Sequence, residues 1–526
     1  KDEGGTLRVK DEKTRPSSSL TPHPSSLRFG IAKNRAIKET DGTMIEKGRG
    51  SVHCPICGQT TPVEDLRRAG LDGKMGERMI AVITDTPNGK DYRPVEPTDL
   101  NAFEQAKKLA EKVERPSEYI VPEINAPNAP PDAGAHRSIS VDIYGFKTFG
   151  SLFNSRQLLA MQTLVVCLRK ALTELEKEET KEYCQAVGTF LGLWVSRNAM
   201  RFTSMGRYDS GGETFQSPFA SQSIAMVWDY SEPNPFNEST GGSLSQLDWI
   251  LRVIFHESSP SDGQSSVRVL HGDGAKLSLP SHFADAAVTD PPYFDSIAYA
   301  DLSDFFYIWL KRGLSDLFPE SFSTPQTPKA EEAVAHKHRH HGDREKGQEH
   351  FQRKLAACFA ETKRVCKPDG VITVMFAHQS TEAWTALISA LFDAGLNITA
   401  TFPIDTELKN RSIALGVAAL ESSITVICRP RQVGAAAAFK DVRAEIEKEV
   451  RESVHRFWDY GFRGADLIVA CYGPAVGVFG RHERVERADG TPVEVPELLE
   501  LARESALKAI AGEFQGDPLS RLYYVW

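Results

Sequence analysis

The stretch Ala286-Ala-Val-Thr-Asp-Pro-Pro-Tyr293 decides how this 526-residue chain is interpreted. Its first four residues are small or β-branched and predict a buried strand that ends at Asp290. Two prolines follow, and because each fixes φ and lacks a backbone N–H, the strand ends there in a stiff turn. A polar turn directly after a buried strand is where an open α/β sheet binds its ligands.

Outward from this turn, residues 267–430 alternate between short apolar strands and amphipathic helices. This alternation predicts an α/β fold with a parallel sheet. Ser380 is the expected N-cap of one helix and Gly395 its stop. The expected strands are 267–270, 286–289, 371–376, 396–402 and 422–428, with a turn at 367–370, and the expected helices are 302–310, 350–365 and the one after Ser380.

Each residue of the turn offers a distinct chemical group. Asp290 offers a carboxylate acceptor, Pro291 and Pro292 hold their carbonyls in set directions, and Tyr293 offers an aromatic face. An acceptor, a rigid carbonyl and a stacking ring together suit the amino group of a planar base. The alternative interpretation is an ordinary strand-ending turn with an exposed tyrosine.

Longer segments carry a resemblance to known enzymes. Val288–Leu310 resembles motif IV of the DNA methyltransferases that act on amino groups, at adenine N6 or cytosine N4, and aspartate in the first position is more typical of the adenine enzymes. Residues 50–526 resemble the zinc-ribbon-containing adenine-specific DNA methylases, also called the domain-of-unknown-function 1156 methylases. The matching segments are Tyr144-Gly-Phe146, Leu152-Phe153, Arg156-Gln157-Leu158-Leu159, Trp228-Asp229-Tyr230, Asn234-Pro235-Phe236, Phe376-Ala377-His378 and Phe457-Trp458-Asp459-Tyr460.

The resemblance implies a Rossmann-like class I methyltransferase core that uses S-adenosylmethionine and acts on DNA. The target base would be flipped out, since its amino group is unreachable inside the stack. Asp290 and the Pro291 carbonyl would accept hydrogen bonds from that amino group, Pro292 would stiffen the turn, and Tyr293 would stack on the base. Asp273 is the best candidate for a cofactor contact in this sequence, and Phe294, His378 and Arg411 are candidates for substrate contacts. The alternatives are a strand-end turn at Asp273, a structural histidine at 378 and an ordinary surface arginine at 411.

The sequence departs from that family at the cofactor. No strand followed by a glycine-rich loop is recognisable, and Gly473, Gly477 and Gly480 fall inside an expected helix. In the family this loop precedes the zinc ribbon, so we expect a fragment or a split gene product whose core is incomplete at its N-terminal side. A second polypeptide would then supply the loop.

Cys54 and Cys57 form a Cys-x-x-Cys turn, and a structural zinc site needs four ligands. We expect a half zinc ribbon whose remaining ligands come from elsewhere, the alternative being a zinc-free loop with two thiols. The cluster of His336, His338, His340 and His341 favours a mobile basic loop beside the catalytic turn over a metal site.

The pattern predicts six regions. They are a polar arm (1–50), a zinc-ribbon-like region (51–115), a proline-rich linker (116–140), a helical insert with two long helices at 156–177 and 179–200 (141–265), the catalytic half (266–435) and a helical C-terminal region (436–526). The net charge of −9 does not favour nucleic acid by itself, but the first 80 residues carry 15 basic against 11 acidic side chains.

No run of about 18 apolar residues occurs, so no membrane span is expected. Ordinary cysteine usage favours a reducing compartment and hence the cytoplasm. The sequence thus predicts an adenine-N6 DNA methyltransferase. Two alternatives stay open: an enzyme acting on cytosine N4 or on RNA, and a non-catalytic DNA-binding or scaffold subunit.

Overall fold

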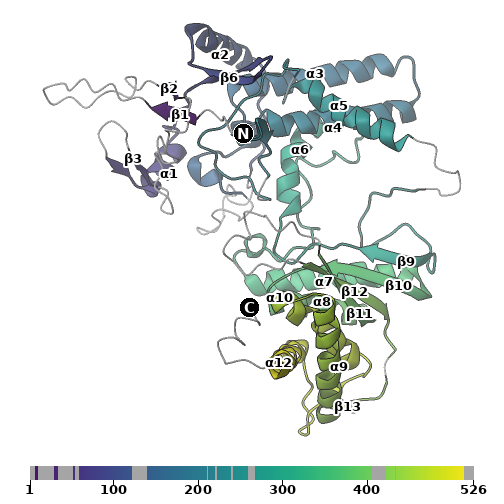
Figure 1. Cartoon of the computed structure of the whole chain (residues 1–526). Coiled ribbons are helices and arrows are strands. Elements are labelled where there is room, and N and C mark those ends of the chain that lie inside the picture. The colour runs from purple at the N-terminus through teal and green to yellow at the C-terminus, as the bar shows by residue number, and fades with distance from the viewer. Residues whose placement is uncertain are drawn as a thin grey trace. The chain divides into compact units, whose positions relative to one another are not determined.

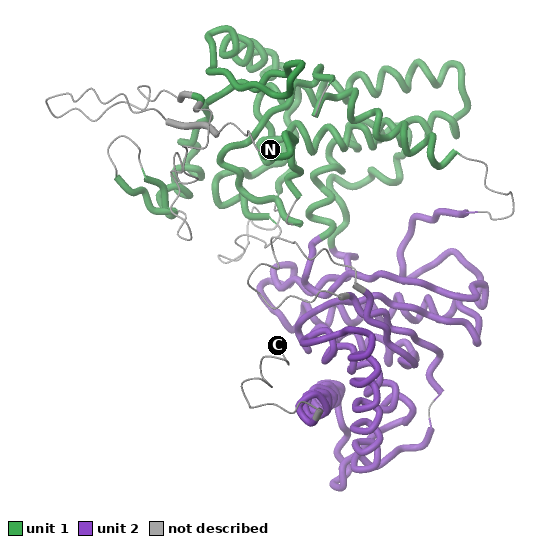
Figure 2. The backbone as a smooth tube through the Cα atoms, viewed as in Figure 1, with its two compact units in different colours: residues 1–265, 299–329 green, residues 266–298, 330–526 purple. Residues whose placement is uncertain are grey.

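The computed structural model describes residues 6–9, 29–32, 51–53, 59–120, 139–209, 211–219, 222–238, 241–258, 267–405, 422–432 and 434–513 (Figure 1). The chain divides into two compact units. Unit 1 comprises residues 1–265 and 299–329, and unit 2 comprises residues 266–298 and 330–526 (Figure 2). In the described part of the chain, no helix has the length and apolar character to cross a membrane.

Unit 2 is built on a four-stranded mixed sheet with the order β9-β10-β12-β11. The strands are β9 (Ala284–Thr289), β10 (Cys366–Phe376), β11 (Leu396–Asp405) and β12 (Ser422–Pro430). β9 runs parallel to β10, whereas β12 runs antiparallel to both of its neighbours. The α/β class is therefore confirmed, but the expected all-parallel sheet is wrong, because a strand buried on both faces has the same apolar pattern in either direction.

Two local expectations on this sheet are also wrong. Residues 267–270 form no strand, and the side chains of Val267 and Val269 are 88% and 90% exposed. A strand needs a partner for its backbone groups, and apolar alternation alone does not supply one. The expected turn at 367–370 lies instead within β10 as an irregularity between Cys366 and Val371.

Helices cover this sheet and supply its core. α7 (Arg344–Val365) and α8 (Thr381–Asp393) pack against one another. As the sequence predicts, Ser380 caps α8, its Oγ accepting from the Ala383 amide at 3.3 Å, and Gly395 follows the helix at φ +70°. The buried apolar side chains of α7 and α8 include Phe351, Leu355, Phe359, Trp384, Leu387 and Leu391.

The C-terminal region is helical, as expected. It contains α9 (Phe439–Asp459), α10 (Gly464–Ala470), α11 (Tyr472–Phe479) and α12 (Val495–Glu513), with the short strands β13 (Ala437–Ala438) and β14 (Val485–Glu486) pairing in parallel. The three suggestive glycines lie along α11 where it meets β11. A Cβ on Gly473 would stand 2.0 Å from Thr401 Cγ2, and one on Gly480 would stand 1.8 Å from Asn397 Oδ1. These glycines allow close packing of a helix on a strand.

Unit 1 centres on long helices, two of them close to their expected bounds. α3 (Ser155–Leu175) and α4 (Lys181–Arg201) pack together, and α6 (Tyr299–Leu314) packs on both. Asn154 starts α3 with a reciprocal capping box to Gln157, and Thr180 caps α4. Because α6 and the following loop belong to this unit, the segment 266–435 is divided between the two units.

Smaller elements complete unit 1. β5 (Val82–Thr86) pairs with β6 (Gly89–Arg93) in an antiparallel hairpin whose two-residue turn is Pro87-Asn88. The further elements are β1 (Thr6–Val9), β2 (Phe29–Ala32), β3 (Val52–His53), β4 (Thr60–Thr61), α1 (Val63–Leu71), β5 (Val82–Thr86), β6 (Gly89–Arg93), α2 (Pro97–Ala110), η3 (Asp142–Tyr144), η4 (Phe149–Leu152), β7 (Arg207–Asp209), β8 (Thr214–Gln216) and α5 (Ser243–Glu257).

Candidate active site

The turn after β9 and the loop after β10 lie at the same edge of the sheet, because the two strands run parallel. Thr289, the last residue of β9, pairs with Val374, and β10 ends two residues later at Phe376. Asp290 and His378, which are 88 positions apart in the sequence, therefore follow neighbouring strand ends. This is the edge at which α/β sheets bind ligands.

Asp290 and Tyr293 are joined within the turn. The Tyr293 hydroxyl donates to Asp290 Oδ1 at 2.8 Å, and the tyrosine ring meets Phe376 edge-on at 5.5 Å between centroids. Asp290 is exposed, whereas Tyr293 is partly buried. The Pro292 carbonyl accepts from the Phe294 amide at 3.2 Å, while no group in the described segments donates to the Pro291 carbonyl. The Pro291 oxygen and Asp290 Oδ2 are thus two acceptors on one rigid turn.

Phe294 holds the end of this turn in an uncommon backbone conformation. Its φ is +57°, and its side chain is only 3% exposed. The ring meets Phe351 of α7 at 5.2 Å and His378 at 5.6 Å, and its carbonyl accepts from the Ala335 amide at 3.0 Å. A buried aromatic residue at positive φ needs such support, and strain of this kind is commonest at functional sites. Phe294, expected to contact substrate, is packed inside the protein.

His378 uses both ring nitrogens within the protein. Nδ1 accepts from the Ser380 amide at 3.1 Å and lies 2.9 Å from Ser380 Oγ, while Nε2 lies 3.2 Å from Asp295 Oδ1. Since the amide N–H must donate, Nδ1 is unprotonated, and the Nε2 proton faces Asp295. His378 therefore ties the loop after β10 to the turn after β9.

Asp273 lies away from this turn. Its Oδ1 accepts from the Ala275 amide at 2.9 Å in a tight local turn, and a Cβ on Gly274 would be 3.3 Å from Cys358 Sγ of α7. Cys358 is two helical turns beyond Phe351, the residue that contacts Phe294, which is a separation of roughly 10 Å along the helix. The strand-end position expected for Asp273 is not formed, because residues 267–270 are not a strand.

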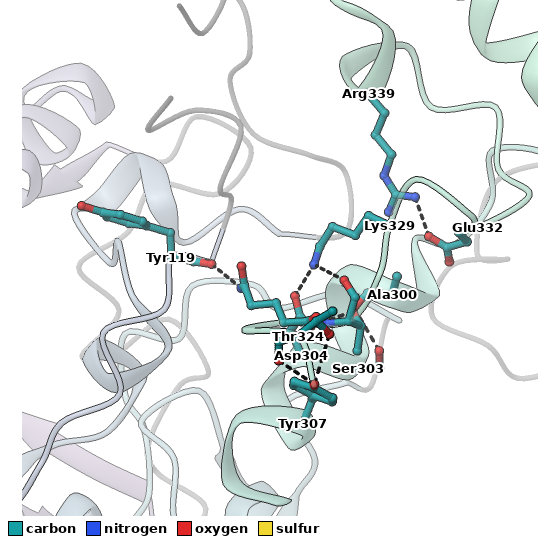
Figure 3. A network of polar contacts seen from close by, with 11 residues as sticks. Tyr119, Ala300, Ser303, Asp304, Tyr307, Thr324, Lys329, Glu332 and Arg339 are labelled. Atoms are coloured by element: carbon teal, nitrogen blue, oxygen red, sulfur yellow. Dashed lines mark hydrogen bonds and ion pairs between the residues drawn. The ribbon is translucent and has the colours of Figure 1, made fainter. Parts of the chain in front are cut away.

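The histidine cluster lies beside the turn, as expected, but it forms a short helical turn and not the loop that the sequence suggested. It forms η5 (Lys337–His340), which follows the Ala335 amide that binds Phe294. Arg339 pairs with Glu332 at 2.6 Å (Figure 3), and both side chains are nearly buried. Burial, and then the nearby His350, lower the pKa of His340. The segment is folded against the protein core.

The expected metal ligands and one expected substrate residue fall outside the described segments. They are Cys54, Cys57 and Arg411, and most of the proline-rich linker lies outside as well. β3 and β4, on either side of the cysteine pair, form a small antiparallel hairpin. The described residues contain no group of three or more histidine, cysteine or acidic side chains placed to hold a metal ion.

Comparisons of the chain with protein-family models, with curated proteins and with solved structures gave no match. The geometry of the site therefore carries the functional interpretation. Sequence reasoning missed Asp295, because its partner His378 lies 83 residues away and no spacing links the two.

Proposed function

We propose that this chain is the target-base half of a DNA methyltransferase that acts on the exocyclic amino group of adenine. The observation that carries the proposal is the pair of acceptors at the sheet edge, Asp290 Oδ2 and the Pro291 carbonyl, beside the ring of Tyr293. An amino group with two N–H donors matches two acceptors, and a flipped base needs an aromatic neighbour.

The residues of the turn would act by position and charge. Hydrogen bonds to Asp290 and Pro291 would draw the amino protons aside and leave the nitrogen lone pair available for attack. Tyr293 would hold the base in register, and Asp290, kept in place by the tyrosine hydroxyl, would stabilise positive charge on the nitrogen. A Rossmann-like core is part of the same proposal, supported by the parallel β9–β10 pair with its polar turn.

S-adenosylmethionine supplies the methyl group when it is bound. The described residues do not fit it by themselves: Asp273 lies against α7, and the three glycines of α11 pack on β11. We include in the proposal that a glycine-rich strand and loop come from outside these 526 residues.

The unpaired edge of β9 supports the proposal that a further strand joins this sheet. In the described sheet β9 pairs with β10 alone, and its Val288 side chain is 76% exposed. Apolar side chains that precede β9 are exposed as well: Phe283 by 60%, Val267 by 88% and Val269 by 90%. An unpaired strand edge is normally covered or paired, and exposed apolar side chains of this number mark a surface that another chain segment covers.

Two measurements test the proposal. In the complete assembly, Asp290→Ala should abolish methylation and leave DNA affinity unchanged, because phosphate contacts dominate binding. Wild-type turnover by that variant would remove Asp290 from the mechanism. For the chain alone, calorimetry should detect no micromolar binding of S-adenosylmethionine. If the wild-type assembly and the Asp290→Ala assembly both bind DNA and neither methylates it, the chain is better described as a non-catalytic scaffold subunit.

A further inference from the structure

Two arginines of unit 1 are partly buried without a counter-ion. Arg197 and Arg201 lie one turn apart on the same face of α4. Arg197 Nη2 donates to Gln246 Oε1 at 3.1 Å, and Arg201 Nη1 donates to the Phe215 carbonyl. The Nε atoms of both are shielded from solvent and unpaired, and no carboxylate of the described residues pairs with either guanidinium.

Physical chemistry makes this arrangement costly unless something else binds there. A shielded cation loses hydration, and a neutral amide or carbonyl acceptor offsets only part of that loss when no counter-ion is present. Two such cations on one helix face also repel each other. Burial lowers the pKa of both guanidinium groups, and the charge of Arg197 lowers that of Arg201 further. The pair is therefore short of an anion.

Neighbouring groups add further unsatisfied donors. The hydroxyls of Ser231 and Ser243 are also buried without a partner. Ser243 opens α5, one turn before the Gln246 that binds Arg197, and its carbonyl accepts from Trp194 Nε1 at 2.8 Å. The Ser231 amide donates to Gly206, just beyond α4. A tetrahedral anion with several acceptor oxygens would satisfy donors of this number and kind.

The rim of this region suits a nucleic acid. Trp249 is 55% exposed, and its ring has two guanidinium groups nearby, Arg197 at 6.0 Å and Arg252 at 5.3 Å from the centroid. Phe236 and Phe255 are 90% and 75% exposed. Arginines interleaved with exposed aromatic rings are typical of surfaces that bind a phosphate backbone and stack on bases.

We propose that Arg197 and Arg201 form a phosphate-binding site, and that the phosphate belongs to the backbone of a nucleic acid strand. The assignment to nucleic acid rests on the proposed function, whereas the need for an anion rests on the two arginines alone. Phosphate binding here is distinct from the chemistry at Asp290, since it lies in the other compact unit.

The test is fluorescence anisotropy of a labelled DNA duplex with the full chain, repeated over a range of salt concentrations. Arg197→Gln and Arg201→Gln should each weaken binding about tenfold, and each should make the slope of log K against log salt shallower by about one. Arg169→Gln is the matched control, because Arg169 is an exposed arginine of the same unit with its own partner, Asp316, at 2.6 Å. It should bind like the wild type.

Thermal unfolding separates a binding role from a structural one. Removing an uncompensated charge should leave the melting temperature of Arg201→Gln unchanged or raised. A fall in melting temperature with no change in DNA affinity would overturn the site. So would equal losses in the Arg169→Gln control, which would indicate general electrostatics.

Two further arms identify the source of the phosphate and separate this inference from the proposed enzyme. The chain could bind inorganic phosphate or pyrophosphate stoichiometrically, lose that binding in Arg201→Gln, and yet bind no DNA. This result would overturn the assignment to nucleic acid. Arginine-dependent DNA binding in an assembly that never methylates would support the site and refute the proposed methylation.

Discussion

The hydroxyl of Tyr293 donates a hydrogen bond to Oδ1 of Asp290, three residues earlier in the turn after β9. The bond is 2.8 Å long and closes the turn on itself, while Phe376 supports the tyrosine ring from the end of the next strand. One carboxylate oxygen is thus used to orient the group, and the other has no hydrogen-bond partner among the described residues. The same side chain that would stack on a base therefore also positions the acceptor.

This double role predicts a graded response. Tyr293→Phe keeps the ring and loses one hydrogen bond, worth about 1 kcal/mol, so methylation by the complete assembly should fall by roughly fivefold. Tyr293→Ala also loses stacking, worth about 1–3 kcal/mol, and should fall much further. Steady-state kinetics on both variants checks the order. Equal rates for the two would mean that the ring does no stacking.

The glycines of α11 predict a change in stability. Gly473→Ala would place a methyl group 2.0 Å from Thr401 Cγ2, so β11 or α11 must shift, at about 1–3 kcal/mol. At Gly512, in α12, an added Cβ would meet nothing within 4 Å, and Gly512→Ala should stabilise the helix by about 0.5–1 kcal/mol. Urea unfolding compares them. An unchanged midpoint for Gly473→Ala would contradict the packing role.

Much of the α/β pattern could be predicted from sequence, because strand ends and helix caps are local signals. Ser380, Gly395 and the turn at Asp290 all carry such signals, and the strand and cap expected around them form. The direction of β12 could not be predicted, since its apolar run is the same in both directions. Pairings such as His378 with Asp295 depend on the completed sheet. The hairpin of β5 and β6, by contrast, carries a local sequence signal, because Pro87, Asn88 and Gly89 are all typical turn residues.

Glu361 predicts a pH-dependent attachment of the segment that follows Asp273. Its carboxylate accepts from Arg364 at 2.7 Å and from the Leu277 amide at 2.8 Å. These bonds, with that from Arg364 the larger influence, lower the pKa of Glu361 to about 2 from an ordinary value of 4.5. A folded-state pKa below the unfolded one gives stability that is present above about pH 4.5 and lost as the pH falls toward 2. The protection of the Leu277 amide against hydrogen exchange, relative to an unstructured amide at the same pH, should fall over that window.

The matched variant is Glu361→Gln. It retains an acceptor oxygen but has no charge to titrate, so protection of the Leu277 amide should be lower at neutral pH and flat through the same window. An identical pH profile in wild type and variant would assign the change to other carboxylates.

A last prediction concerns the buried ion pair between Asp304 and Lys329 (Figure 3). Asp304 is fully buried on α6, and its carboxylate accepts from Lys329 Nζ at 2.5 Å and from the Thr327 amide at 2.8 Å. Burial nevertheless raises the pKa of Asp304, with Lys329 opposing it. Asp304→Ala removes the carboxylate from the buried ammonium group and should cost about 3–5 kcal/mol in the free energy of unfolding.

Lys329→Met distinguishes this charge effect from simple loss of packing. It leaves Asp304 buried beside an apolar chain, and a carboxyl group whose pKa is already raised then escapes the penalty by binding a proton. Because the folded state then binds that proton more readily than the unfolded state, the destabilisation by Lys329→Met should shrink as the pH falls toward the raised pKa. The loss of unfolding free energy in Asp304→Ala should not shrink in this way, because that variant has no carboxyl group at position 304 to bind a proton. Urea unfolding of unit 1 at several pH values measures both, and a pH-independent cost for Lys329→Met would show that Asp304 stays ionised without its partner.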